Sequence, residues 1–309
     1  MMTSKELWAE GFPYDGPQDV PLGLIQGSGT WGLKFPYEVD EPEVEVLWEG
    51  EIETPYPRDA EPNFRLSPKL QYLRVGDRKA ITVASHGWQP NRDPVEYMAS
   101  QKIFWIFRNA GVKWIVGGGT CGILNNAILT GDLIVPNDFI DYTKRRIVSL
   151  PGTDLEFPMF TLLQRAKQAI CPSIARTIKR AAKGLSFGRV HGYDRELIHA
   201  VTEGPRFETR AEVRRLRLQL NDTVGQSMVP EVDLARLCGM HIAFVYYGVN
   251  PAEGLLESQQ WNLDELHETL RLDMARLHLR TLKLLPLDEK CGCMEYRVER
   301  PTEYKEGLS

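Results

Sequence analysis

The sequence predicts an α/β fold in which a central mixed β-sheet is flanked by helices. Strand-like and helical segments alternate from residue 21 to residue 286, which is typical of a sheet covered by helices. No internal repeat and no linker divides residues 21–286, so we expect a single domain. A loose, acidic N-terminal extension (1–20) is expected before this domain, and a C-terminal tail (287–309) after it.

Apolar runs rich in β-branched and aromatic residues predict the strands. They lie at residues 21–26, 80–84, 113–116 and 241–249, and another begins at Leu133 and continues toward Asp141. Residues 37–67 are rich in Pro, Glu and Asp, which predicts loops with short strands.

Capping residues and helical periodicity predict the helices. The clearest helix covers residues 94–110, between Asp93, which suits the N-cap, and Gly111, which ends it. Further helices are predicted at 172–183, 210–220 and 230–238, and from Asn262 to Pro286.

Charge and hydropathy exclude several classes of protein. The net charge of −5 and the isoelectric point near 5.8 argue against binding to nucleic acid or to an anionic membrane surface. No apolar run approaches the roughly 18 residues of a membrane span. The first 20 residues have no apolar stretch that could serve as a signal peptide, so we expect a cytoplasmic protein.

The cysteines and histidines predict neither a disulfide framework nor a metal site. Five cysteines, an odd number in a long chain, are typical of a reducing compartment. Cys291-Gly292-Cys293 could ligate a metal or form a cross-link, but no other ligands are nearby in sequence. The six histidines form no HxH or HxxxH pair.

A glycine-rich segment after the first predicted strand resembles a dinucleotide-binding fingerprint. Gly27-Ser28-Gly29-Thr30-Trp31-Gly32 satisfies GxGxxG, but Pro36 and Pro42 prevent the helix that this fingerprint requires. A backbone this bare can still approach an anion and donate N–H groups to it. We therefore expect a phosphate or oxyanion cradle, with a plain turn as the alternative.

Four further segments lie at strand ends or helix starts, where ligand sites form in open α/β sheets. They are Ser85-His86-Gly87, Gly119-Thr120-Cys121-Gly122, the stretch EGPRFETRAE from Glu203, and the stretch SMVPEV from Ser227. Together with the glycine loop, GDLIVPNDFIDYT and YYGVN, these segments resemble the trimeric purine nucleoside phosphorylase and methylthioadenosine phosphorylase family. They follow one another along the chain in the same order as in that family. The resemblance covers about Pro21 to Leu285.

The resemblance implies a nucleoside phosphorylase-like fold and a pentosyltransferase of purine salvage. In such a reaction phosphate attacks the anomeric carbon of a purine nucleoside, and free base and ribose 1-phosphate leave. Phosphate is a co-substrate, and no cofactor is implied. The family also implies a homotrimer in which a neighbouring subunit closes part of the pocket.

The resemblance implies four phosphate ligands. Ser28 matches the hydroxyl of the family's glycine loop, and His86, also implied in catalysis, matches the histidine of its second phosphate turn. Thr120 matches the position that offers a backbone N–H, and Ser227 matches a hydroxyl that precedes a helix.

For the base, Glu208 and Asn250 match the pair used by the branch that acts on 6-oxopurines, with Phe207 beside them. A carboxylate accepts from the N1–H of a 6-oxopurine, and an amide can donate to O6 and stabilise the leaving base. The alternatives are a helix cap for Glu208 and a turn for Asn250, which precedes Pro251.

The expected ribose contacts are Gln226, Met228 and Leu263. An apolar residue at the place of Leu263 suits a 5′-deoxy or 5′-methylthio group, although a leucine at the start of an amphipathic helix is equally a core residue.

Three departures from the family pattern bear on the phosphate and the sugar. Ser85 stands where the family has its phosphate-binding arginine, Gly119 where it has asparagine or threonine, and Gln226 where it has a methionine under the ribose. Another cation, from among Arg92, Lys144, Arg145 and Arg146, would have to replace the arginine. Otherwise the protein is a nucleoside hydrolase or a purine-binding protein without catalysis.

Overall fold

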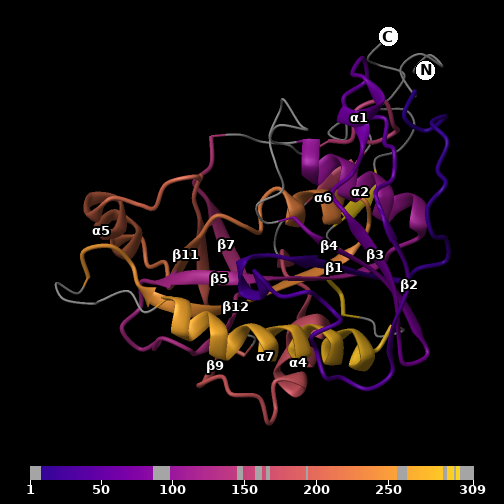
Figure 1. The fold of residues 1–309 in the computed structure, drawn as a ribbon. Helices are drawn as coiled ribbons and strands as arrows, with labels where there is room; N and C mark the ends of the chain where they lie inside the picture. The colour runs from indigo at the N-terminus through magenta and orange to yellow at the C-terminus, as the bar shows by residue number, and fades with distance from the viewer. Residues whose placement is uncertain are drawn as a thin grey trace.

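The computed structural model describes residues 8–85, 98–144, 149–156, 162–164, 168–192, 194–255, 263–287, 291–295 and 297–299. Within these ranges one mixed sheet of eleven strands forms the centre, and helices cover both of its faces (Figure 1). The predicted α/β fold with a central mixed sheet is confirmed. None of the described helices is both long enough and apolar enough to span a membrane.

The strand order of the sheet brings segments that are distant in sequence next to one another. Its main path is β2 (Val44–Gly50), β3 (Leu70–Val75), β4 (Arg78–Ala84), β1 (Leu22–Gln26), β5 (Trp114–Ile123), β11 (Thr223–Gly225), β10 (Ile198–Val201) and β7 (Asp138–Asp141). A branch adds β12 (His241–Pro251) beside β5, then β6 (Leu133–Val135) and β9 (Val190–Gly192).

The central strands β4, β1, β5 and β12 are parallel, so their carboxyl ends meet at one edge. β11 is antiparallel to β5, and β10 and β7 continue from it in parallel.

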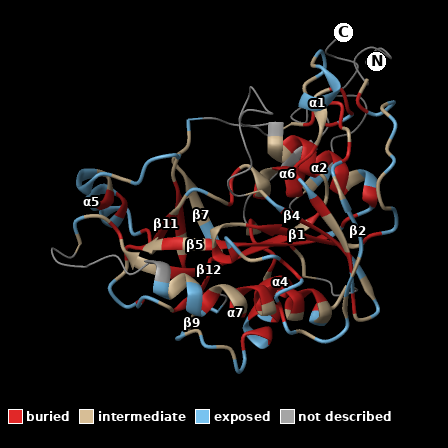
Figure 2. Cartoon of the chain, in the orientation of Figure 1, coloured by how far each residue is buried: buried red, intermediate tan, exposed pale blue. Residues whose placement is uncertain are grey.

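Helices pack on both sides of these strands. α4 (Pro172–Ala181) and α7 (Leu263–Leu284) cover one face, and α2 (Met98–Ala110) and α6 (Glu231–Leu237) cover the other (Figure 1). Two short helices are α1 (Pro62–Arg65) and α5 (Arg210–Leu218), and β8 (Leu162–Gln164) pairs with β13 (Arg297–Glu299) in a small separate sheet. Buried residues concentrate in the sheet and on the helix faces that cover it (Figure 2).

β5 is longer than its sequence predicts, because it continues through Gly117-Gly118-Gly119 to Ile123. A Cβ atom on Gly117 would lie 2.4 Å from the ring of Phe244, and one on Gly118 would lie 2.1 Å from His278. The glycines therefore extend the strand by letting side chains of β12 and α7 pack directly on its backbone.

Other predicted elements differ in detail. The strand predicted from Leu133 toward Asp141 is two strands, β6 and β7, with different neighbours. The helical period of residues 210–220 places Leu220 on a buried face, yet α5 ends at Leu218 and Leu220 is 78% exposed with a φ of 61°.

The described part of the N-terminal extension is packed on the domain rather than loose. Ala9 is buried, its N–H donates to Gly152 O at 2.9 Å, and its carbonyl accepts from the Trp105 indole at 3.1 Å. Phe12 and Tyr14 contact Trp105 edge-on. This segment therefore covers part of α2.

A methyl group at Gly117 should destabilise the protein, because it would overlap the Phe244 ring in a packed sheet. We expect Gly117→Ala to lower the free energy of unfolding by about 1–3 kcal/mol, measured by urea denaturation. Gly11→Ala is the matched control, since the nearest atom to its added Cβ is 4.0 Å away. Equal loss in both variants would contradict the proposed packing role.

Candidate functional site

The carboxyl ends of β1, β4 and β5 bring the predicted phosphate segments together. β1 ends at Gln26 and β4 at Ala84, and Ser85 N–H donates to Gln26 O at 3.3 Å. A Cβ on Gly27 would lie 2.4 Å from Gly118 O. The glycine loop therefore lies directly against the glycines of β5, and only a bare backbone permits that approach.

Ser28 and Thr120 meet in this contact. The hydroxyl of Ser28 is 2.8 Å from the hydroxyl of Thr120, and Thr120 N–H donates to Ser28 Oγ at 3.1 Å. The loop is held from behind by Gln26, whose side chain accepts from Thr30 Oγ1 at 3.1 Å and donates to Thr82 Oγ1 at 2.7 Å. Two hydroxyls and one N–H are thus fixed at one point.

Ser227 lies on the other side of the same glycines. A Cβ on Gly119 would be 3.6 Å from Ser227 Oγ, and this hydroxyl donates to Tyr246 OH at 3.4 Å. The next residue, Met228, has a φ of 107°, which is strained for a side chain of this kind. Strained backbone that persists in a packed structure is common at functional sites.

Glu208 is tied to the end of β11 through Thr202. The Thr202 hydroxyl donates to Glu208 Oε1, and Thr202 N–H donates to Gly225 O at 2.8 Å. Since Gly225 is two residues before Ser227, this link brings the Glu208 carboxylate near the segment that carries the Ser227 hydroxyl. The bond from Thr202 holds one carboxylate oxygen of Glu208 toward the protein.

Asn250 comes to the same edge from β12. It pairs in register with Gly122 of β5, and Val224 of β11 flanks Gly122 on the opposite side. The Asn250 amide donates to Pro251 O at 2.7 Å, so its carbonyl oxygen is turned the other way. Asn250 thus lies on a strand beside β5, whereas Glu208 lies in the loop after β10 and is linked through Thr202 to β11, the neighbour of β5 on the other side.

The remaining predicted site residues have different environments. Phe207 is 64% exposed, and the exposed Gln226 donates to Arg206 O at 2.8 Å. Met228 is fully buried. His86 lies outside the described residues, and for Leu263 the structure describes its place at the start of α7 but not its side chain.

Sequence reasoning assigned no role to Tyr246, which contacts Ser227, or to Glu231, whose carboxyl bonds Ser100 of α2. Tyr246 is buried and stacks on His199 at 4.6 Å, and burial raises the pKa of Tyr246 well above its ordinary value, so its hydroxyl stays protonated. Glu231 accepts from Ser100 Oγ at 2.9 Å, and burial also raises the pKa of this carboxyl. The run HIAFVYYGV is apolar along almost its whole length, so it indicated a buried strand but not which tyrosine lies against Ser227.

α7 contributes a third contact that the sequence did not indicate. The Tyr247 hydroxyl is 2.6 Å from His267 Nδ1 and 3.4 Å from Gly29 O, so α7 and β12 meet behind the glycine loop. Arg271, also on α7, has Nη1 3.4 Å from the Cβ position of Gly32. This guanidinium is paired with Glu268 at 2.7 Å, and sequence alone did not point to this arginine.

The cations predicted to replace the family's arginine are mostly outside the described residues. This holds for Arg92, Arg145 and Arg146, whereas Lys144 is described and exposed.

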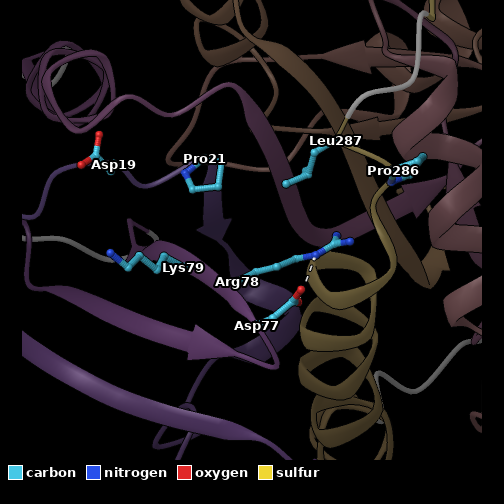
Figure 3. Close-up of a pocket in the computed structure, with 7 residues that line it drawn as sticks. All are labelled: Asp19, Pro21, Asp77, Arg78, Lys79, Pro286 and Leu287. Atoms are coloured by element: carbon cyan, nitrogen blue, oxygen red, sulfur yellow. Dashed lines mark ion pairs between the residues drawn. The ribbon is translucent and has the colours of Figure 1, made fainter.

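A separate hollow of about 620 Å³ opens at the other end of β1. It is lined by Asp19, Pro21, Asp77, Arg78, Lys79, Pro286 and Leu287 (Figure 3). The Asp77–Arg78 ion pair spans 3.7 Å, and Arg78 also donates to Leu282 O. None of the predicted site residues lines this hollow.

The fold and these strand-end groups define an α/β protein with a candidate ligand site at the carboxyl edge of its parallel strands. A family model described as the phosphorylase superfamily matches residues 41–285, most of the chain. The protein therefore belongs to the phosphorylase superfamily.

Its relatives are nucleoside phosphorylases. A probable S-methyl-5′-thioinosine phosphorylase of Methanopyrus kandleri is 31% identical over 233 residues, which cover 74% of this chain and 86% of the relative. The 6-oxopurine nucleoside phosphorylase of Pyrococcus furiosus is 28% identical and matches 89% of this chain and 96% of its own. The S-methyl-5′-thioadenosine phosphorylase of the same organism matches at the same identity and coverage.

Solved structures share the fold at lower identity. Methylthioadenosine phosphorylase from Schistosoma mansoni, in complex with adenine, has a TM-score of 0.69 at 21% identity, over 89% of this chain and 95% of the other. A methylthioadenosine phosphorylase from an Antarctic soil metagenomic library has a TM-score of 0.69 at 20% identity, over 92% and 94%.

Loss of the Ser28 hydroxyl should weaken anion binding at the glycine loop. We expect Ser28→Ala to lower the affinity for inorganic phosphate about tenfold, the value of one hydrogen bond to a charged group, measured by calorimetry. Thr269→Ala removes an exposed α7 hydroxyl that bonds Glu265 O and should leave the affinity unchanged. Unchanged affinity in Ser28→Ala would remove this residue from the site.

Proposed function

We propose that the protein is a purine nucleoside phosphorylase that prefers 6-oxopurines. The observation that carries this proposal is the meeting of Ser28, Thr120 and Ser227 around the glycines of β5, beside Glu208 and Asn250. Hydroxyl and N–H donors suit an oxyanion, while the carboxylate and amide suit the edge of a purine. Relatives at 28–31% identity are named for 6-oxopurine and methylthio-nucleoside substrates.

In the proposed reaction a phosphate oxygen forms a bond to the anomeric carbon as the bond from that carbon to purine N9 breaks. The bonding electrons pass to the purine, and the products are free base and ribose 1-phosphate. The ribosyl transition state is positive, so a phosphate held at Ser28 and Ser227 would stabilise it electrostatically.

Discrimination between bases is assigned to Glu208 and Asn250. Thr202 fixes one oxygen of Glu208, which leaves the carboxylate oriented to accept from the N1–H that 6-oxopurines carry and adenine lacks. The Asn250 amide exchanges its bond to Pro251 O for one to purine O6 or N7. Donation there stabilises the negative charge that develops on the leaving base.

The ribose contacts are assigned to Gln226, Met228 and Leu263, with Leu263 at the 5′ group, and His86 is assigned to the phosphate and to catalysis. An apolar residue at position 263 favours a 5′-deoxy or 5′-methylthio substituent over a free hydroxyl.

A nucleoside hydrolase is the second candidate, and Ser85 favours it. This residue lies beside Gln26 at the turn where the family carries its phosphate arginine. A buried phosphate dianion without that cation costs several kcal/mol unless another cation compensates. Water is neutral and avoids this cost.

The proposed assembly is a homotrimer in the cytoplasm. Large apolar residues near the site edge are exposed, namely Phe207 at 64%, Leu218 at 84% and Leu220 at 78%. Such residues support burial against another subunit. A solution mass equal to one 35.2 kDa chain, measured by light scattering, would contradict the trimer.

Base release should depend on phosphate. With inosine, guanosine and 5′-methylthioinosine we expect release that rises and saturates with added phosphate and yields ribose 1-phosphate or its 5′-substituted form. Equal rates with and without phosphate would establish hydrolysis instead. Purine binding by calorimetry with no release under either condition would indicate a binding protein.

An acidic residue at position 250 should change the preferred base. Asn250→Asp places a carboxylate that accepts from the 6-amino group and repels O6, so we expect the ratio of kcat/KM for inosine over adenosine to fall about tenfold or more. Asn109→Asp, on α2, is the control, because its amide bonds Trp105 O instead. An unchanged ratio in Asn250→Asp would place the base elsewhere.

A further inference from the structure

Three cysteines and a histidine gather at the amino end of β12, away from the candidate nucleoside site. They are Cys171, His241, Cys291 and Cys293, and their ligand atoms all lie within 4.8 Å of one another. Asn250 lies nine residues further along β12, which separates the two ends by about 30 Å at the usual rise of a strand.

The four side chains converge on one point. His241 Nδ1 is 3.1 Å from Cys293 Sγ, 3.2 Å from Cys291 Sγ and 3.7 Å from Cys171 Sγ. Cys291 Sγ and Cys293 Sγ are 3.0 Å apart. Ligands bonded at about 2.3 Å for sulfur and 2.0 Å for nitrogen around a tetrahedral ion lie about 3.5–3.8 Å from one another, and the observed spacings, from 3.0 Å to at most 4.8 Å, bracket this range.

Independent elements of the fold hold these ligands in place. Cys171 is fully buried at the start of α4, and its N–H donates to Ile242 O at 2.8 Å, which ties it to β12. The His241 ring stacks on Trp114 of β5, with centroids 4.0 Å apart and planes 9° apart, which directs Nδ1 toward the sulfurs. Cys293 is 2% exposed.

Arg236, at the end of α6, supplies the charge that such a cluster needs. Three thiolates and a neutral imidazole around a divalent ion carry a net charge of −1. Arg236 Nη1 donates to Cys293 Sγ at 3.1 Å, and its other nitrogens donate to Ala169 O and Gln168 O. A guanidinium bonded to a ligand sulfur is a typical outer-shell partner of a thiolate site.

We propose that Cys171, His241, Cys291 and Cys293 form a tetrahedral Cys₃His zinc site. Soft thiolates with one imidazole favour Zn²⁺ over oxygen-loving ions such as Mg²⁺ or Ca²⁺. Four protein ligands leave no open position, so the ion is structural rather than catalytic. The sequence predicted no metal site because His241 is 50 residues from Cys291 and 70 residues from Cys171.

The proposed zinc fastens the C-terminal tail to the sheet. Cys293 lies four residues before Arg297, the first residue of β13, which pairs with β8, and Arg297 Nε donates to Leu237 O at the end of α6. The opposite end of α6 follows the Ser227 segment. The ion would therefore stabilise the same helix that follows a candidate phosphate ligand.

The test is a metal analysis of the whole, untagged chain purified under reducing conditions. We expect one zinc per chain by mass spectrometry, three thiols that react only after chelation, and a melting temperature that falls by about 5 °C or more on chelation. Cobalt(II) in place of zinc should give the intense visible absorption of a tetrahedral thiolate site.

Cys293→Ser should lose the zinc, and Cys238→Ser, which removes a cysteine outside the cluster, should keep it. Wild-type protein that binds no zinc after reduction and metal loading would overturn the proposal, as would zinc retained by Cys293→Ser. A Cys291–Cys293 disulfide in protein kept under reducing conditions would also overturn it. The wild-type thiol count decides the matter even where Cys293→Ser does not fold.

Discussion

The parallel pairing of β5 with β12 is the constraint on which both ends of the molecule depend. It runs from His241 opposite Trp114 to Pro251 opposite Ile123. Bare glycines in the middle of β5 let Phe244 and His278 press against its backbone, and the same glycines receive the Ser28 loop from β1. Since the packing of an interior tolerates little change in volume, a side chain added there would move the strand, the loop and the covering helix together.

The candidate site has few cations in a protein of net negative charge. Its described donors are the hydroxyls of Ser28 and Thr120 and the Thr120 N–H, which bond one another, and Arg271 lies on the far side of the loop near Gly32. Neutral donors in a partly buried site can hold an oxyanion, but each contributes less than a guanidinium. The choice between phosphorolysis and hydrolysis therefore depends more on whether a cation is present near Ser85 than on the base-binding residues.

Local patterns in the sequence were enough to predict much of the sheet. β1, β4 and β12 follow from apolar runs, and α4 and α6 from caps and periodicity, because these signals are local. The length of β5 did not follow, since glycines disfavour strands unless distant side chains fill their space, as Phe244 does. The family resemblance pointed to Ser28, Glu208 and Asn250, whereas Tyr246 and Arg271 needed contacts between distant segments. The Cys₃His cluster was not predicted for the same reason, because its residues come from segments that are distant in the sequence.

The spacing of the four cluster residues along the chain has a consequence for folding. Cys291 and Cys293 follow every described strand of the central sheet, whereas Cys171 and His241 come earlier and are brought together when α4 docks on β12. The four-residue cluster is complete only when residues 291–293 have folded back onto the sheet. A chain truncated before residue 291 would keep every described strand of the central sheet yet lack half of the cluster, so the cluster reports whether this segment has docked.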